Sequence, residues 1–274
     1  MQSTITNYKR VFFSFLTVSV LFISSCELEI TGNEEANPYL EYHSIEIDPR
    51  TVLYFAVLLP EQYDPQKSYP VLLAIPPGEQ AMSQVNWAID IYYKHQSIQR
   101  NWIVISPAAV GGKKYFEGSE MYIPLLLEWV EERYKVESEK YHIAGISNGG
   151  ISAFHISVMY PQEFQSITVF PGWVLEEDER YLGRLVEMPV TMYVGALDDQ
   201  SVITAMDSTA SMLENLGVQV DYQKWANEGH VIASLTAEYL FDVFDSYRPD
   251  KEVTSIMNKI TVSKLTKNGR QKVD

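Results

Sequence analysis

The pattern of apolar and polar positions changes its period repeatedly from residue 40 onward. Short continuous apolar runs, typical of strands buried on both faces of a sheet, alternate with stretches whose apolar residues recur at helical spacing. The runs predict strands at 41–47, 51–59, 71–75, 102–106, 141–146, 166–170, 190–194 and 218–225, and helices at 80–96, 121–134, 151–160, 205–216 and 231–247. This alternation is typical of an α/β fold, in which helices flank a mostly parallel sheet, here of eight strands.

One α/β domain is expected over residues 40–247, because the pattern contains no internal repeat and no linker long enough to divide it. The strands expected to end at residue 170 and to begin at residue 190 are separated by only 19 residues, 171–189. That is too few for a large lid domain. The remainder, 248–274, is basic and poor in aromatic residues, so we interpret it as a C-terminal tail.

The N-terminal residues have the layout of an export signal. Lys9 and Arg10 precede a mainly apolar run, 11–23, and two serines then lead to Cys26. A membrane-spanning helix needs about 20 apolar residues, so this run of 13 is too short for a permanent span. Residues 1–25 are therefore predicted to be a signal peptide, and the acidic, aperiodic stretch 26–39 a tether.

The segment Ile23-Ser24-Ser25-Cys26 resembles the lipobox of bacterial lipoproteins. The resemblance implies cleavage before Cys26 and lipid on that cysteine, and several acyl chains on one residue anchor a protein stably. Glu27 at the next position points, by the same resemblance, to the outer membrane of a Gram-negative bacterium. The alternative is an ordinary signal peptide with an incidental cysteine.

Composition excludes several function classes. Lys plus Arg is 21 against 36 Asp plus Glu, a formal net charge of −15, which disfavours binding to nucleic acid. Cys26 is the only cysteine, so an intrachain disulfide and a thiolate metal cage are excluded. No Walker loop, paired-histidine metal motif or dinucleotide glycine fingerprint occurs, so neither a metal nor an organic cofactor is expected. The sequence does not indicate an oligomeric state.

The clearest chemical motif is Gly145-Ile146-Ser147-Asn148-Gly149, between a predicted strand and a predicted helix. Gly-x-Ser-x-Gly in this context is typical of a nucleophile elbow, whose tight turn requires residues without side chains beside the serine. Ser147 would then stand at the carboxyl end of a strand and at the N-terminus of a helix, where an anionic intermediate is favoured.

A serine nucleophile needs a base, and the base needs a carboxylate that orients it. On a fold with this elbow the chain order is serine, acid, histidine. His230 is the histidine that follows Ser147 and lies in a loop after a strand, whereas His155 lies inside the helix behind the elbow. The histidines before or inside the elbow strand are interpreted as structural; they are His43, His95 and His142.

Two carboxylates compete to be the acid, because the strand 190–194 runs into Gly195-Ala196-Leu197-Asp198-Asp199. The spacing Gly-x-x-Asp favours Asp198, and Asp199 is the alternative. The carboxylate that is not used is expected to be solvated or to cap the helix near Ser201.

An oxyanion hole needs two backbone N–H donors, one from the residue after the serine, Asn148, and one from the loop after the third strand. That loop is Pro76-Pro77-Gly78-Glu79. Proline has no N–H, so Gly78 or Glu79 must supply the second donor.

These segments together resemble the α/β-hydrolase family, within it the cap-less esterases of the esterase D, feruloyl esterase and predicted-peptidase group. The resemblance covers most of residues 50–246 and is carried by 54–60, 63–65, 69–71, the elbow with Tyr160-Pro161, 195–198 and 229–230. It implies hydrolysis of carboxylic esters through an acyl-enzyme, with Ser147 attacking, His230 moving the proton and Asp198 orienting the histidine. Pro76-Pro77-Gly78 departs from the His-Gly-Gly that members often carry.

The substrate is less well indicated. Trp173, after the strand 166–170, is expected near the mouth of the site, and Tyr115 and Phe116 lie in a loop on the same side. These aromatics could stack on a sugar or an aryl acyl group, or they could cover the core. The acidic cluster 176–179 would repel anionic substrates, or simply begin a solvated helix. A feruloyl-type or carbohydrate esterase fits; the alternatives are a serine peptidase and a non-catalytic binding scaffold.

Overall fold

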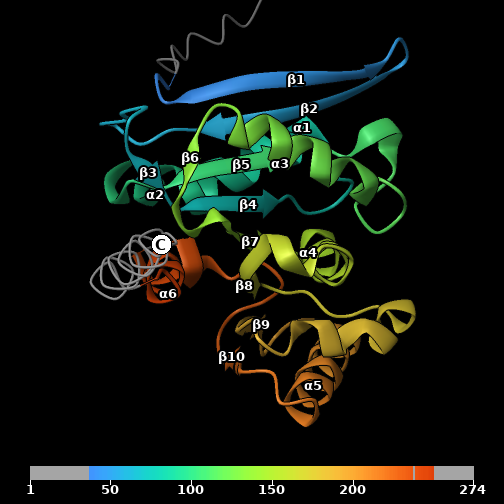
Figure 1. Cartoon of the computed structure of the whole chain (residues 1–274). Coiled ribbons are helices and arrows are strands. Elements are labelled where there is room, and N and C mark those ends of the chain that lie inside the picture. The colour runs from blue at the N-terminus through green and yellow to red at the C-terminus, as the bar shows by residue number, and fades with distance from the viewer. Residues whose placement is uncertain (1–36, 237, 250–274) are drawn as a thin grey trace, which may run out of the picture. The chain divides into compact units, whose positions relative to one another are not determined.

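The computed structural model describes residues 37–236 and 238–249. They form an eight-stranded sheet in the order β1-β2-β5-β4-β7-β8-β9-β10, which Figure 1 shows from β1 at the top to β10 at the bottom. Its strands are β1 (Leu40–Asp48), β2 (Thr51–Leu58), β4 (Val71–Ile75), β5 (Ile103–Pro107), β7 (Tyr141–Gly145), β8 (Phe164–Val169), β9 (Val190–Gly195) and β10 (Val220–Trp225). A small parallel pair is formed by β3 (Ser68–Tyr69) and β6 (Lys135–Val136).

The six strands from β5 to β10 in this order are parallel, whereas β1 and β2 are antiparallel to each other and β2 is antiparallel to β5. Parallel strands bring their carboxyl ends to one edge of the sheet, where ligand-binding loops gather in folds of this kind. The elbow after β7 and the loops after β4, β8, β9 and β10 therefore meet there.

Helices cover both faces of the sheet. The described residues form α1 (Met82–Ala88), α2 (Lys94–Arg100), α3 (Ile123–Glu131), α4 (Asn148–Met159), α5 (Gln200–Asn215) and α6 (Glu238–Ser246). Buried residues of α3, α4 and α5 share one core cluster, while α1 and α6 contribute to the second, on the opposite face. The strands alternate their side chains between these clusters, as a sheet with two buried faces must. The predicted α/β class, with flanking helices and no large lid, is confirmed.

Several predicted boundaries were wrong for identifiable reasons. The helix expected from residue 205 begins at Gln200, because the carboxylate of Asp199 accepts a hydrogen bond from the Ser201 N–H and caps it. The helix expected from 151 begins at Asn148, directly after the serine. The helix expected over 80–96 is interrupted by a π-helical turn, Ile89–Tyr93.

The helix expected over 231–247 also differs, since a 3₁₀ turn, Ala233–Thr236, stands apart from α6. Between β8 and β9 lies a 3₁₀ segment, Glu176–Leu185, in place of a lid.

Some predictions lie outside the described residues: the signal peptide 1–25, Cys26 with the tether up to residue 36, and the tail from 250. Arg248, assigned to that tail, instead binds Glu137 through its Nε at 2.9 Å and lies over the Trp102 ring. None of the helices within 37–236 and 238–249 combines the length and the hydrophobicity that a membrane span requires.

Candidate active site

Ser147 occupies a strained turn between β7 and α4. Its φ of +56° and ψ of −121° lie in a region that residues with a side chain rarely adopt. The turn is held from the neighbouring strand, because the Ser147 N–H donates to the carbonyl of Pro171, after β8, at 2.8 Å. Backbone strain of this kind, supported by surrounding structure, is typical of functional positions.

Two glycines of the motif allow close approach at this turn. A Cβ on Gly145 would lie 2.0 Å from the carbonyl oxygen of Gly149, and a Cβ on Gly149 would lie 2.2 Å from that of Ile75, at the end of β4. Both separations are far below any real contact, so only glycine fits. The start of α4 therefore packs directly against the strand that leads into the proposed oxyanion loop.

His230 bridges the serine and a carboxylate. Its Nε2 lies 2.9 Å from the Ser147 Oγ, and its Nδ1 lies 2.9 and 3.0 Å from the two carboxylate oxygens of Asp198. A carboxylate only accepts hydrogen bonds, so Nδ1 carries the hydrogen and Nε2 is left to accept from the serine hydroxyl. The Asp198 side chain is 4% exposed and that of His230 44%, so the acid is shielded from solvent while the base is accessible to it.

Asp199 takes the role expected of the unused carboxylate. Its Oδ1 accepts from the Ser201 N–H at 2.8 Å and from the Ser201 Oγ at 2.6 Å, which caps the first turn of α5. These bonds lower its pKa. The structure thus brings Asp198, and not Asp199, to the histidine.

Three other histidines have partners elsewhere, and the fourth, His95, is exposed on α2. His142 is wholly buried between Ser166 and Gln165, and burial lowers its pKa to about 3. His155 pairs with Asp178 at 2.8 Å. Burial lowers the pKa of His155, but the hydrogen bond and charge of Asp178, together with the charges of Glu120 and Glu177, outweigh burial and raise the pKa. His43 contacts Glu41 and the Trp129 ring.

The proposed oxyanion loop lies beside the elbow because β4 and β7 are adjacent, with Ile75 opposite Gly145. Gly78 has a φ of +59°, and its carbonyl accepts from the side-chain Nδ2 of Asn148 at 2.9 Å. Within the described part of the chain, the backbone N–H groups of Gly78, Glu79 and Asn148 have no acceptor. They are thus available to a ligand oxygen.

Glu228 holds the loop that carries His230, and sequence reasoning missed it. Its carboxylate accepts from the backbone N–H groups of Ala233, at 3.1 Å, and Ser234, at 3.3 Å, and from the Ser234 hydroxyl. Its own carbonyl accepts from the Leu197 N–H at 3.0 Å, joining this loop to the one that carries Asp198. The only sequence signal is an acidic residue shortly before a helical turn.

The aromatic residues predicted to bind substrate differ in how far they are buried. The Tyr115 side chain is wholly buried, with its hydroxyl on the Ala108 carbonyl at 2.9 Å, so it belongs to the core. Phe116 is half-buried. Trp173 is half-buried and two residues beyond Pro171, whose carbonyl holds the Ser147 N–H. In the acidic cluster Asp178 is buried against His155, while Glu176, Glu177 and Glu179 are exposed.

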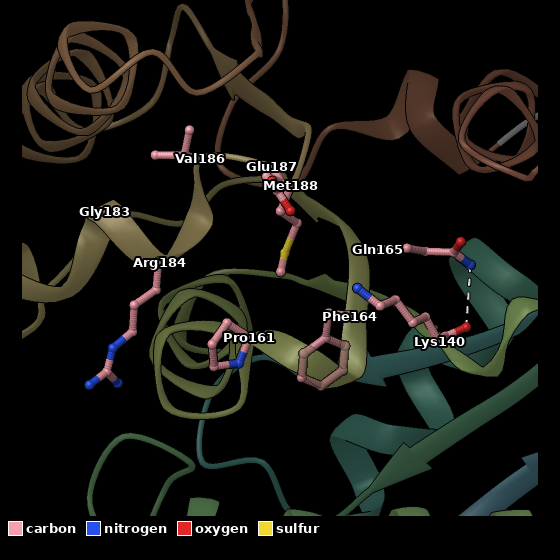
Figure 2. Close-up of a pocket in the computed structure, with 9 residues that line it drawn as sticks. All are labelled: Lys140, Pro161, Phe164, Gln165, Gly183, Arg184, Val186, Glu187 and Met188. Atoms are coloured by element: carbon pink, nitrogen blue, oxygen red, sulfur yellow. Dashed lines mark hydrogen bonds between the residues drawn. The ribbon is translucent and has the colours of Figure 1, made fainter.

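A pocket of about 440 Å³ lies at the other edge of the sheet (Figure 2). Its lining includes Lys140, which precedes β7, Phe164, which begins β8, and Met188, which precedes β9. These are the amino ends of strands whose carboxyl ends support the elbow, so the pocket is separate from Ser147. No group of three or more His, Cys, Asp or Glu side chains suited to a metal occurs among residues 37–236 and 238–249.

Comparison with known proteins gives a family and a fold. The model of the family described as "Putative esterase" matches residues 50–238. No curated protein matches the chain. Fluorophosphonate-binding serine hydrolase F from Staphylococcus aureus is similar in structure, with a TM-score of 0.62 and 11% identity over 77% of this chain and 98% of that one.

Two further solved structures are similar. A feruloyl esterase module from Clostridium thermocellum, complexed with sinapinate, has a TM-score of 0.60 and 13% identity over 74% of this chain and 85% of its own. A thermostable esterase has a TM-score of 0.55 and 16% identity over 68% of this chain, which spans about half of that protein, 54%. At these identities the likeness shows the fold.

Proposed function

Because this chain belongs to the family described as putative esterases, we propose that it hydrolyses carboxylic esters through an acyl-enzyme formed on Ser147. One observation carries the proposal: the hydrogen-bonded series from the Ser147 Oγ through His230 to Asp198, with both steps at 2.9 Å. A binding scaffold has no need of this arrangement, whereas a serine hydroxyl near neutral pH needs a base to become a nucleophile.

In the proposed acylation, the Oγ of Ser147 bonds to the ester carbonyl carbon while its proton passes to the Nε2 of His230. The carbonyl electron pair moves onto oxygen, and the N–H groups of Asn148 and Gly78 stabilise that oxyanion. When the carbonyl re-forms, the alcohol departs with the proton from His230. Water then repeats the sequence on the acyl-enzyme and releases the acid.

Asp198 supports these steps by fixing the histidine. Its carboxylate accepts the Nδ1 hydrogen, which holds the ring in the tautomer that can accept at Nε2, and its charge stabilises the imidazolium that forms. The carboxylate is shielded from solvent, so this interaction is weakened little by water.

For the substrate we propose esters in which the acyl group is aromatic or the alcohol component is a sugar. Trp173 is half-buried, packs in part against the core, and follows Pro171, whose carbonyl holds the Ser147 N–H, and the short 171–189 connection leaves the site open to a large substrate. The fold is also that of the feruloyl esterase module that binds sinapinate. Trp173→Ala is expected to lower kcat/KM for methyl ferulate at least tenfold while changing that for p-nitrophenyl acetate less than threefold. Equal losses on both esters would contradict this specificity.

For the location we propose an exported lipoprotein anchored through lipid on Cys26, in the outer membrane. The support is the signal-like layout of residues 1–26. The full chain expressed in a Gram-negative host should incorporate radiolabelled fatty acid and sediment with membranes, and Cys26→Ala should do neither. A Cys26→Ala protein that remained labelled would contradict the lipid anchor.

The proposed activity is tested by hydrolysis of p-nitrophenyl acetate by wild type and Ser147→Ala. The expected result is turnover by wild type and a loss of at least 1,000-fold in the variant, with Ser208→Ala, an exposed serine on α5, as an unaffected control. If a folded wild-type protein hydrolyses none of a panel of acetyl, feruloyl and longer acyl esters, the binding scaffold becomes the better account.

A further inference from the structure

A buried amide lies directly behind the proposed oxyanion loop. Gln80 is fully buried, and its φ of +57° places it in the left-handed region, which a residue with a side chain enters at a cost. A polar side chain without access to water must find partners within the protein. Both ends of this amide do so: one partner lies on α4 and the other in the loop after β5.

The nitrogen end of the amide reaches the elbow helix. The Gln80 Nε2 donates to the Ser152 Oγ at 2.8 Å, and that hydroxyl donates to the carbonyl of Asn148 at 2.8 Å. Asn148 is the residue whose N–H is the first proposed oxyanion donor. Gln80 is therefore connected to the backbone of Asn148 through two hydrogen bonds, with the Ser152 hydroxyl between them.

The oxygen end and the backbone of Gln80 fix the loop itself. The Oε1 accepts from the Tyr115 N–H at 2.8 Å, and the Gln80 carbonyl accepts from the Ala109 N–H at 2.7 Å. The Gln80 N–H donates to the Pro77 carbonyl at 3.0 Å, which closes a turn around Gly78 and Glu79. The loop is thus hydrogen-bonded both to the segment that follows β5 and to α4.

A second link joins the two donor residues directly, since the Asn148 side chain donates to the Gly78 carbonyl at 2.9 Å. The two proposed donors therefore belong to one hydrogen-bonded unit. One hydrogen bond joins Asn148 to Gly78, and a second joins Gln80, in the loop after β4, to Ser152 on α4. Oxyanion donors act only when they lie about 2.7–3.1 Å from the position of the developing charge, so the spacing between them matters.

We infer that Gln80 is a positioning residue, which sets the spacing between the Gly78 and Asn148 N–H groups through its bond to Ser152. The inference rests on the proposed function. Gln80 does not touch the reacting atoms; it acts by holding the loop after β4 against the start of α4. Loss of this link is expected to weaken stabilisation of the transition state, in which the carbonyl oxygen becomes an oxyanion, far more than it weakens substrate binding.

The experiment compares Gln80→Met, which keeps the length of the side chain and removes both hydrogen bonds, with Ser152→Ala, which breaks the same link from α4. The matched control is Ser157→Ala, a buried serine of the same helix whose hydroxyl has no hydrogen-bond partner within the described chain. For each we measure kcat and KM on p-nitrophenyl acetate, and the Kd of a trifluoromethyl ketone, which forms a tetrahedral adduct with the serine.

Gln80→Met and Ser152→Ala are each expected to lower kcat by about 10- to 100-fold with KM changed less than threefold. The affinity for the trifluoromethyl ketone should fall in parallel, the double variant should lose little more than either single one, and Ser157→Ala should match wild type. A merely structural role would not separate kcat from KM.

The inference is overturned if folded Ser152→Ala and Gln80→Met keep the wild-type kcat, or if kcat and ketone affinity do not fall together. Should Gln80→Met fail to fold, Ser152→Ala alone decides. It removes a single hydroxyl, and Ser157→Ala controls for the loss of a buried serine hydroxyl from the same helix. An inactive wild type is a different outcome: it contradicts the proposed function, and this inference with it.

Discussion

The Nε2 of His230 lies 2.9 Å from the Oγ of Ser147, although 83 positions separate the two residues in the chain. They meet because β7 and β10 belong to the same parallel set, whose carboxyl ends share one edge of the sheet. Neither residue reaches the other through local structure. The contact therefore depends on the residues that hold the loops after β7, β9 and β10 in place.

The two adjacent acids should behave differently when altered. Asp198→Asn keeps the shape of the side chain but removes the acceptor that fixes the His230 tautomer, so kcat should fall by about 10⁴-fold. Asp199→Asn retains a good helix cap and should keep kcat within about twofold. Steady-state kinetics on p-nitrophenyl acetate measures both, and equal losses would contradict the assignment of Asp198.

Asp199 should instead matter for stability. Asp199→Ala removes the acceptor for the Ser201 N–H at the start of α5, and loss of such a cap costs about 1 kcal/mol. Urea denaturation should show this decrease in the free energy of unfolding, with kcat unchanged. An unchanged stability would mean that the cap contributes nothing in solution.

Glu228 should affect activity through the loop that carries His230. Its carboxylate binds residues 233 and 234, beyond the histidine, so Glu228→Ala frees the segment between them. The expected result is a fall in kcat of about tenfold with little change in KM, since a small displacement of a base is costly. Glu46→Ala, on β1, is the control; equal effects of the two variants would exclude a specific role for Glu228.

The close approach of α4 to β4 should make Gly149 intolerant of a side chain. Gly149→Ala would place a Cβ 2.2 Å from the Ile75 carbonyl oxygen, and we expect a loss of about 3 kcal/mol or more in the free energy of unfolding. Gly183→Ala meets nothing within 4 Å and should stay within about 0.5 kcal/mol of wild type. Denaturation curves that do not distinguish them would contradict the described packing.

The pair of His155 and Asp178 should make stability depend on pH. The pKa of His155 is raised above its ordinary 6.5, so the stabilisation from the pair is fully present below pH 6.5 and is lost as the pH rises through the raised value. The difference in unfolding free energy between wild type and His155→Gln should therefore be larger at about pH 5.5 than at about pH 9. A difference that grows with pH would have the wrong sign.

The parts of the site that depend on local geometry could be predicted from the sequence. Ser147 was identifiable because its turn needs glycine at 145 and 149, and both requirements are visible in five consecutive residues. The strands were identifiable because those buried on both faces are continuous apolar runs. The α/β class followed from the alternation of elements, whereas the order of the strands in the sheet was not predicted.

The choice between Asp198 and Asp199 depends on contacts that are distant in the chain. The path of the loop after β9 is set by Ala196 and Leu197, whose N–H groups donate to the carbonyls of Trp225 and Glu228. Gln80 was equally hidden, because its partners Ser152 and Tyr115 lie 72 and 35 positions away and its left-handed φ is one that sequence patterns assign to glycine.

The intact mass of the protein after reaction with a fluorophosphonate shows most directly whether Ser147 is an activated nucleophile. We expect one label per chain, mapped to Ser147 by peptide sequencing, none on Ser147→Ala, and much slower labelling of Asp198→Asn. A folded wild-type protein that takes no label, or takes it at another residue, would contradict the account of Ser147 as an activated nucleophile.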